Sequence, residues 1–208
     1  MDLFAALNWR YAVRAFSEQK VPDKTLKALL DATRLSASSY GLQPYSLIVV
    51  ESDEVREKLV PFSYGQDKVL NSSHLVVFAV HEQIGDETVD RYFNKYQQIT
   101  GKPYSSFQDY SDHVKQAFAS KTEEQKRDWA HQQAYIALGQ FLTSAAMLKI
   151  DSCPMGGIDQ QGYDQVLNLK QKALTTTVVC PIGYRHPDDH HAVAPKVRFE
   201  HHEMVMEI

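Results

Sequence analysis

Hydrophobic residues recur at helical spacing in the first part of the chain. Three leucines that share one helix face follow Pro22, a residue suited to the first turn of a helix. We therefore expect a helix over residues 22–36. A shorter helix is expected over residues 2–8, where Asp2 lies near the positive N-terminal end.

Three other segments are continuous apolar runs rich in β-branched residues. They are residues 45–51 (YSLIVVE), 75–80 (LVVFAV) and 175–183 (TTTVVCPIG). Such runs are typical of strands that are buried on both faces. Ser52 follows the first run and can cap the next helix, whose first turn is acidic. Because helical segments separate the strands, we expect partly parallel pairing.

The longest helical pattern lies between the second and third strands. Residues 85–120 are polar and aromatic, with a break at a glycine and a proline, and Thr122 begins a helix that runs to about residue 149. Over residues 132–148 this helix is apolar on nearly every face. It must then be buried on every face, either at the domain centre or at a subunit interface.

These patterns predict an α+β protein with one domain over residues 1–208. Apolar residues at 43% and charged residues at 23% are near the globular average. The net charge of −4 and the scattered Lys and Arg argue against nucleic acid and anionic membranes as partners. The tail after Gly183 is polar and is expected to be extended.

Targeting and cysteine usage favour the cytoplasm. The N-terminus lacks the features of a secretory signal, and residues 132–148 fall short of the roughly 20 apolar residues that span a bilayer. Cys153 and Cys180 match no metal-binding or redox spacing, so we expect two reduced thiols.

Two cationic pairs are candidates for phosphate binding. Arg10 and Arg14 are four residues apart and would share a face on a helix, where two guanidinium groups can clamp a phosphate. Lys196 and Arg198 would point the same way in an extended segment. Solvated surface is the alternative for both pairs.

Two loops could approach a ligand closely. Residues 36–44 (SASSYGLQP) offer hydroxyl groups and amides, and residues 153–159 (CPMGGID) contain Gly156 and Gly157, which leave backbone amides accessible. Simple turns are the alternative. Residues 186–191 (HPDDHH) contain metal-ligand residue types without the spacing of a site, so we expect no metal. Dinucleotide, P-loop and nucleophile-elbow motifs are missing from the sequence.

Taken in this order, the segments resemble the nitroreductase family of flavin mononucleotide (FMN) enzymes, across essentially the whole chain. The resemblance implies cofactor contacts from five segments: Arg10, Tyr11, Ala12 and Arg14; Ser38, Ser39, Gly41 and Gln43; Gln66 and Lys68; Pro154, Met155, Gly156 and Gly157; Lys196 and Arg198. The chain departs from the family pattern at Ala12, Gly41 and Gly156, where Ser, Asn and Glu are common.

The resemblance also implies a fold and an activity. The fold is a mixed sheet flanked by helices in an intertwined homodimer, in which Ser38 and Ser39 reach the flavin of the other subunit. The activity is ping-pong hydride transfer from NADH or NADPH to a nitroaromatic, quinone or similar flat acceptor. It needs no obligatory catalytic side chain, because the flavin carries the redox chemistry. Tyr40, Phe107 and Tyr110 are expected to line the acceptor pocket, although helix packing is an equal alternative for the aromatic residues over 92–118.

Three alternatives stay open from the sequence. A flavin-binding sensor or storage protein would bind FMN and be reduced slowly. A dehalogenase-like or flavin-modifying enzyme would keep the fold and change the chemistry. A metal-binding protein would use the histidines of residues 186–191. The sequence does not choose between NADH and NADPH.

Overall fold

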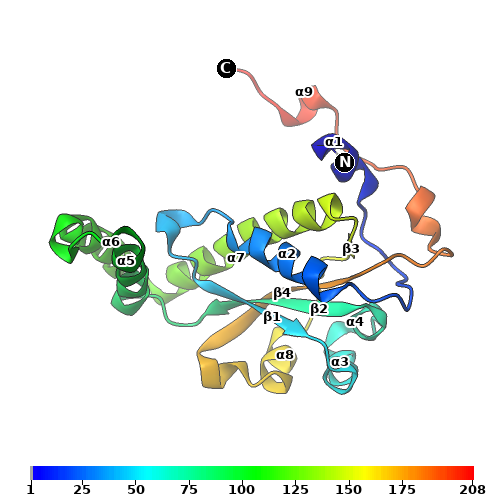
Figure 1. Cartoon of the computed structure of the whole chain (residues 1–208), viewed down its shortest axis with the longest axis horizontal. Coiled ribbons are helices and arrows are strands. Elements are labelled where there is room, and N and C mark those ends of the chain that lie inside the picture. Colours follow the sequence, from blue (N-terminus) through cyan, green and yellow to red (C-terminus); the bar gives the residue numbers. More distant parts are fainter. Residues whose placement is uncertain (1) are drawn as a thin grey trace.

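The computed structural model describes residues 2–208 and has an α+β architecture, as expected (Figure 1). Its centre is one four-stranded sheet with the order β1-β2-β4-β3. The strands are β1 (Tyr45–Val50), β2 (His74–His81), β3 (Asp151–Ser152) and β4 (Leu174–Gly183). The three apolar runs are confirmed as strands.

The named strands pair in the antiparallel sense, so the prediction of partly parallel pairing is wrong for them. Val50 at the end of β1 is opposite Leu75 at the start of β2, and His81 at the end of β2 is opposite Leu174 at the start of β4. The connection from β1 to β2 thus returns to the end of the sheet at which β1 finishes. The connection from β2 to β3 crosses to the opposite end, because Asp151 at the start of β3 is opposite Gly183 at the end of β4. A parallel bridge does join Ala12 to Ser152.

Helices cover both faces of the sheet (Figure 1). On one face lie α2 (Asp23–Arg34) and α7 (Glu123–Met147); on the other lie α3 (Asp53–Leu59), α4 (Lys68–Asn71) and α8 (Gln160–Val166). Side chains of β2 alternate between the two cores, with Val76 and Phe78 in the first and Leu75 and Val77 in the second. Burial on both faces explains why β2 and β4 read as continuous apolar runs.

β1 departs from that prediction. It forms one edge of the sheet, and five of its six residues are only half-buried, with Val50 alone fully buried. The continuous apolar run therefore does not correspond to burial on both faces within one chain.

An aromatic helical arm extends from one end of the sheet (Figure 1). It consists of α5 (Asp86–Thr100), the short 3-10 turn η3 (Tyr104–Ser106) and α6 (Gln108–Ala119), and Gly101 ends α5 with a left-handed φ of 66°. α7 then begins after Thr122, whose hydroxyl accepts a hydrogen bond from the Gln125 amide at 3.2 Å. The expected break and helix start are both confirmed.

The apolar half of α7 is buried on one face only. Its side chains Tyr135 and Ile136 are 51% and 49% exposed, and Met147 is 42% exposed. Leu3 and Phe4 of the neighbouring helix α1 (Leu3–Trp9) are also exposed. Full burial of this helix is therefore wrong for the single chain.

The C-terminal tail leaves the sheet after Gly183 and passes α1 (Figure 1). It is mostly extended, with two short helical segments, η5 (His190–Val193) and α9 (His201–Met204). The remaining short segments are η1 (Ser39–Gly41), η2 (Pro61–Ser63) and η4 (Leu169–Lys172). Cys153 and Cys180 are free and buried. No helix within residues 2–208 is both long enough and apolar enough to cross a membrane.

Candidate functional site

The arginine-rich segment after α1 is extended rather than helical. Arg10 ends α1 with φ −73° and ψ 141°, and Ala12 then pairs with Ser152 at the edge of the sheet. The Val13 amide donates to the Ser152 carbonyl at 3.3 Å. The helical face assumed for Arg10 and Arg14 is therefore wrong, because the segment adds to the β3 edge of the sheet.

A cavity of about 360 Å³ nevertheless brings the two cationic pairs together. Its lining comes from residues 10–14 and from the tail: Arg10, Tyr11, Ala12, Arg14, His191, Ala194, Pro195, Lys196, Val197 and Arg198. The lining contains four guanidinium or ammonium groups and no carboxylate among the described residues. We call it the cationic pocket.

The cations of this pocket are close enough to repel one another. Burial, and then the charge of Arg198, lower the pKa of Arg10. Burial, and then the charges of Arg10 and Arg198, lower the pKa of Lys196. The Lys196 ammonium donates to the carbonyls of Leu7 and Arg10, whereas the Nε atom of Arg10 is buried with no hydrogen-bond partner among the described residues. Such a pocket favours an anion.

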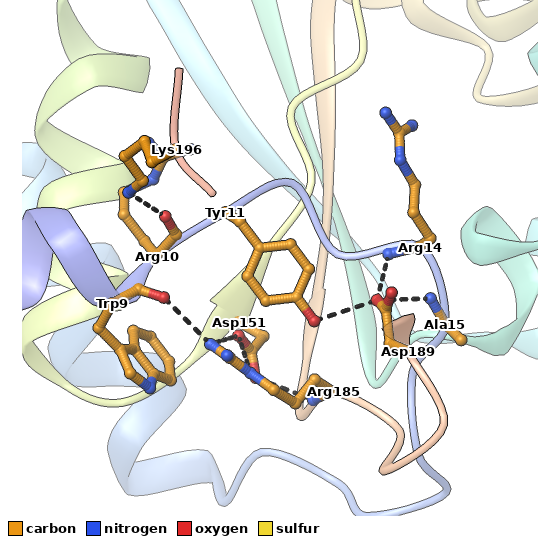
Figure 2. Close-up of polar contacts among 9 residues, drawn as sticks. All are labelled: Trp9, Arg10, Tyr11, Arg14, Ala15, Asp151, Arg185, Asp189 and Lys196. Carbon is orange, nitrogen blue, oxygen red and sulfur yellow. Dashed lines mark hydrogen bonds and ion pairs between the residues drawn. The ribbon is translucent and has the colours of Figure 1, made fainter. Parts of the chain in front are cut away.

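Asp189 joins the two segments of the chain that form the pocket (Figure 2). Its carboxylate accepts hydrogen bonds from the amides of Arg14 at 2.7 Å and Ala15 at 3.2 Å, and from the Tyr11 hydroxyl at 3.1 Å. Burial alone would raise the pKa of Asp189, but these bonds and the His191 amide lower it to about 2. Asp189 is therefore ionised at neutral pH and fixes residues 11–15 to the start of the tail.

Arg185 supports the same segment from the other side (Figure 2). Its guanidinium lies 4.3 Å from the ring centre of Trp9 and 4.6 Å from that of Tyr11. It also pairs with the buried carboxylate of Asp151, at 2.6 Å between Nη2 and Oδ1. These contacts hold both ends of the turn that presents Arg10.

The double-glycine segment and Lys68 lie around the same buried cluster as the arginine segment. Val13, Val69 and Met155 belong to that cluster, and Met155 exchanges two backbone hydrogen bonds with Val179, at 2.8 and 3.1 Å. Pro154 is half-buried. A Cβ at Gly157 would meet nothing within 4 Å, and one at Gly156 would meet only the Tyr135 hydroxyl at 3.5 Å.

Lys68 begins α4 and is 8% exposed. No hydrogen bond or ion pair to its ammonium is found within residues 2–208. Its ammonium is therefore available to an acceptor that approaches from outside the chain. Gln66 lies close by in sequence, and its side-chain amide donates to the Ser63 carbonyl at 3.0 Å.

The serine-rich loop lies elsewhere. The Ser39 amide donates to Gln133 of α7 at 2.8 Å, and the Ser38 hydroxyl accepts from the Gln43 amide at 3.1 Å. The Gln43 side chain donates to the Arg34 carbonyl at 2.8 Å. Gly41 has φ +73°, and a Cβ there would lie 2.8 Å from the Tyr92 ring. The positive φ and the close approach of the Tyr92 ring together explain why residue 41 is a glycine.

The helix α7 separates this loop from the cationic pocket within one chain. The loop contacts Gln133, whereas Trp9 lies beside Lys149, just past the end of α7, at 5.0 Å from the ammonium to the ring. At 1.5 Å per residue, the helix from Gln133 to Met147 spans about 21 Å. The structure therefore places two of the five segments in the pocket lining and leaves residues 38–43 apart from it, while the Lys68 and double-glycine segments share a buried cluster with Val13.

The expected acceptor residues have different environments. Phe107 is buried and stacks on Phe93, with ring centres 5.4 Å apart. Tyr110 is 50% exposed on α6, and Tyr40 has φ 55° with its ring edge toward Phe118 at 6.0 Å. The contacts of Phe107 match the helix-packing alternative, and a role for these residues toward an acceptor stays a prediction.

Several residues of the site were missed from the sequence. Asp189 lies in the run of residues 186–191 that suggested only surface or metal, and Arg185, Asp151 and Gln133 carried no motif. No group of three or more metal-ligand side chains occurs within residues 2–208. The sequence does not distinguish Asp189 from Asp188, since the amides that bind the Asp189 carboxylate lie 174 and 175 residues away.

The chain is similar to known proteins in sequence and in fold. A model of the nitroreductase family matches residues 7–184. A Staphylococcus haemolyticus protein provisionally named an NAD(P)H nitroreductase is 33% identical over 192 residues, which cover 86% of this chain and 87% of that protein.

Solved structures share the fold at lower identity. A nitroreductase structure from Bacillus subtilis has a TM-score of 0.88 at 21% identity and covers 99% of this chain and 98% of its own. A structure from Exiguobacterium sibiricum, described as a nitroreductase in complex with FMN, has a TM-score of 0.86 at 17% identity and covers 100% and 98%. On the family match and the 33% identity, this chain belongs to the nitroreductase family.

Proposed function

We propose that this chain is an FMN-dependent NAD(P)H oxidoreductase that reduces nitroaromatics, quinones or similar flat acceptors. The observation that carries the proposal is the cationic pocket: four cationic side chains converge there without a carboxylate in its lining. A phosphomonoester is the ligand that such a set of guanidinium and ammonium groups favours.

The residues around the pocket fit FMN. Arg10, Arg14, Lys196 and Arg198 would hold the phosphate, and the buried Arg10 Nε supplies a donor that has no partner in the chain. Lys68 would meet the polar edge of the ring, where its ammonium gains an acceptor. The open space at Gly156 and Gly157 would leave room for the flat ring against the backbone.

A bound flavin would supply the chemistry for hydride transfer between NADH or NADPH and the acceptor. The chain would bind the flavin and orient it relative to the nicotinamide and the acceptor. A cation at Lys68 would stabilise negative charge on a nearby ring, and the Gly157 amide, in a segment where an added Cβ would meet nothing within 4 Å, would donate a hydrogen bond to the ring. No side chain is assigned as an obligatory acid or base. In a ping-pong scheme the nicotinamide and the acceptor would occupy the same face of the flavin in turn.

A homodimer would complete the site. Residues 38–43 contact α7 at Gln133, away from the end of α7 that lies near the pocket. The exposed apolar side chains of α1 and α7, including Phe4 and Ile136, offer a surface that a second copy can cover. A two-fold axis would carry the loop of one chain toward the pocket of its partner. We infer that the active unit is a dimer with two flavin sites.

The experiment that tests the function is a visible spectrum of the purified protein before and after anaerobic NADH or NADPH. We expect a flavin spectrum that bleaches rapidly with at least one nicotinamide and recovers when a quinone or nitroaromatic is added. Protein that is colourless and takes up no added FMN would contradict the proposal. Bound FMN that is reduced slowly by both nicotinamides would favour the sensor or storage alternative.

A further inference from the structure

His191 is a residue of the cationic pocket to which the proposed function assigns no role. It lies in η5, where the chain turns toward Lys196, and it is the one histidine in the pocket lining. Its side chain is 58% exposed. The ring therefore has access both to the pocket and to solvent.

Asp189 determines which ring nitrogen carries the proton. The Oδ1 atom of Asp189 accepts from the His191 backbone amide at 3.1 Å, and it lies 3.1 Å from His191 Nδ1. The Asp189 side chain is 1% exposed and ionised, so it acts only as an acceptor. Nδ1 must then donate, which leaves Nε2 as the nitrogen that changes state when the imidazole is protonated.

The surroundings of His191 favour an anion in the pocket. The groups that line the pocket with it are Arg10, Tyr11 and Arg14 from the first segment and Lys196 and Arg198 from the tail, and Asp189 Oδ1 lies 3.1 Å from its Nδ1. Asp188, His186 and His190 are its charged or titratable neighbours in sequence. Without an anion, protonation would add a fifth cation to four; with a dianion, the same proton would gain a hydrogen bond.

We propose that His191, held by Asp189, is a fifth ligand of the phosphoryl group and that anion binding is coupled to proton uptake at this imidazole. The inference rests on the proposed function and adds a pH-sensitive contact to it. Protonation of the imidazole adds a positive charge and a second N–H donor, so the contact with an anion is stronger at low pH than at high pH.

The test measures FMN binding to the flavin-stripped protein between pH 5.5 and 8.5. Quenching of flavin fluorescence reports the binding. We compare wild type with His191→Gln, and with His190→Gln as the matched control, because His190 is exposed and outside the pocket lining. His191→Gln should weaken FMN binding about tenfold at pH 6 and no more than about twofold at pH 8.5. His190→Gln should behave as wild type.

Two further arms identify the group that His191 contacts. Riboflavin lacks the phosphate, so its affinity should not depend on His191. Sulfate stays a dianion over this pH range, so its competition with FMN should strengthen toward low pH in wild type and much less in His191→Gln. Calorimetry in buffers of different ionisation enthalpy should show more proton uptake on FMN binding in wild type than in the variant.

The outcomes separate this inference from the proposed function. If FMN binds and wild type and His191→Gln have the same pH dependence, the inference is wrong while the function stands. A His191 effect of equal size with riboflavin would also overturn it, because the contact would not be with phosphate. If FMN fails to bind at all, the proposed function fails, and sulfate binding by thermal shift still decides whether His191 serves an anion.

Discussion

Arg185 and Asp151 form an ion pair at the edge of the sheet that also carries the cationic pocket. The guanidinium Nη2 lies 2.6 Å from Oδ1, and Nε lies 3.0 and 3.1 Å from the two carboxylate oxygens. The Asp151 side chain is 4% exposed. Because the same guanidinium lies between the rings of Trp9 and Tyr11, the pair ties the pocket's first segment to the sheet.

Removing the carboxylate should therefore destabilise the protein strongly. Asp151→Asn leaves the Arg185 charge partly buried without its partner, and we expect a loss of about 3 kcal/mol in the free energy of unfolding. Urea denaturation measures it. Asp31→Asn is the matched control, because Asp31 pairs with Lys27 at 2.6 Å in an exposed position, where solvent screens the pair and it contributes little to stability. Equal losses for both variants would contradict the role of the buried pair.

Two glycines should respond very differently to an added methyl group. A Cβ at Gly162 would lie 2.0 Å from the Phe62 ring, whereas a Cβ at Gly157 would meet nothing within 4 Å. We expect Gly162→Ala to lower the free energy of unfolding by about 2–3 kcal/mol through overpacking, and Gly157→Ala to change it by less than about 0.5 kcal/mol. Thermal or urea unfolding of both variants checks this, and a tolerant Gly162 would mean that Phe62 moves freely.

The sequence predicted the positions of the strands better than their directions. Runs such as residues 75–80 are apolar throughout because both sheet faces are covered, and that property is local. Direction depends on where each connection returns to the sheet, which the pattern of one segment does not contain. β1 has the same composition but lies at an edge, so its burial depends on what lies beside it.

The cationic part of the site was also predictable, although partly for a wrong reason. Arg10 and Arg14 do line the same pocket as Lys196 and Arg198, but from an extended segment instead of a helix. Asp189 could not be recognised, because its environment is created by amides that are 174 and 175 residues away in the chain.

The exposed face of α7 should control assembly. Ile136 is 49% exposed on that face, and a charge there would be buried if two copies pack together. Ile136→Glu should therefore shift the protein from dimer to monomer and release FMN, as read by analytical ultracentrifugation and by the flavin spectrum. Ile99→Glu is the control, since Ile99 is 75% exposed at the end of α5, on the helical arm. A variant at Ile136 that remains dimeric would exclude this face as the interface.

Asp189 should make stability depend on pH in a defined window. Its pKa is lowered from 3.8 to about 2 in the folded chain, so the unfolded chain binds the proton first as the pH falls. The stabilisation is complete above about pH 4 and is lost as the pH falls toward 2. Asp189→Asn should therefore lower the free energy of unfolding by about 2 kcal/mol at pH 7. The difference in this free energy between the variant and wild type should be smaller at pH 3. Asp188→Asn, an exposed neighbour, should show no such difference in urea unfolding.

Lys68 should reveal a trade between stability and binding. The residue is 8% exposed and its ammonium has no ion-pair partner within residues 2–208, so replacement by the apolar Met should stabilise the flavin-free protein by about 1 kcal/mol. The same change removes a cation from the proposed ring edge, so the rise in melting temperature on adding FMN should shrink. Lys58→Met is the control, because Lys58 is exposed and pairs with Glu54 on the surface. If Lys68→Met is less stable without FMN and equally stabilised by it, the lysine serves the fold and has no part in binding.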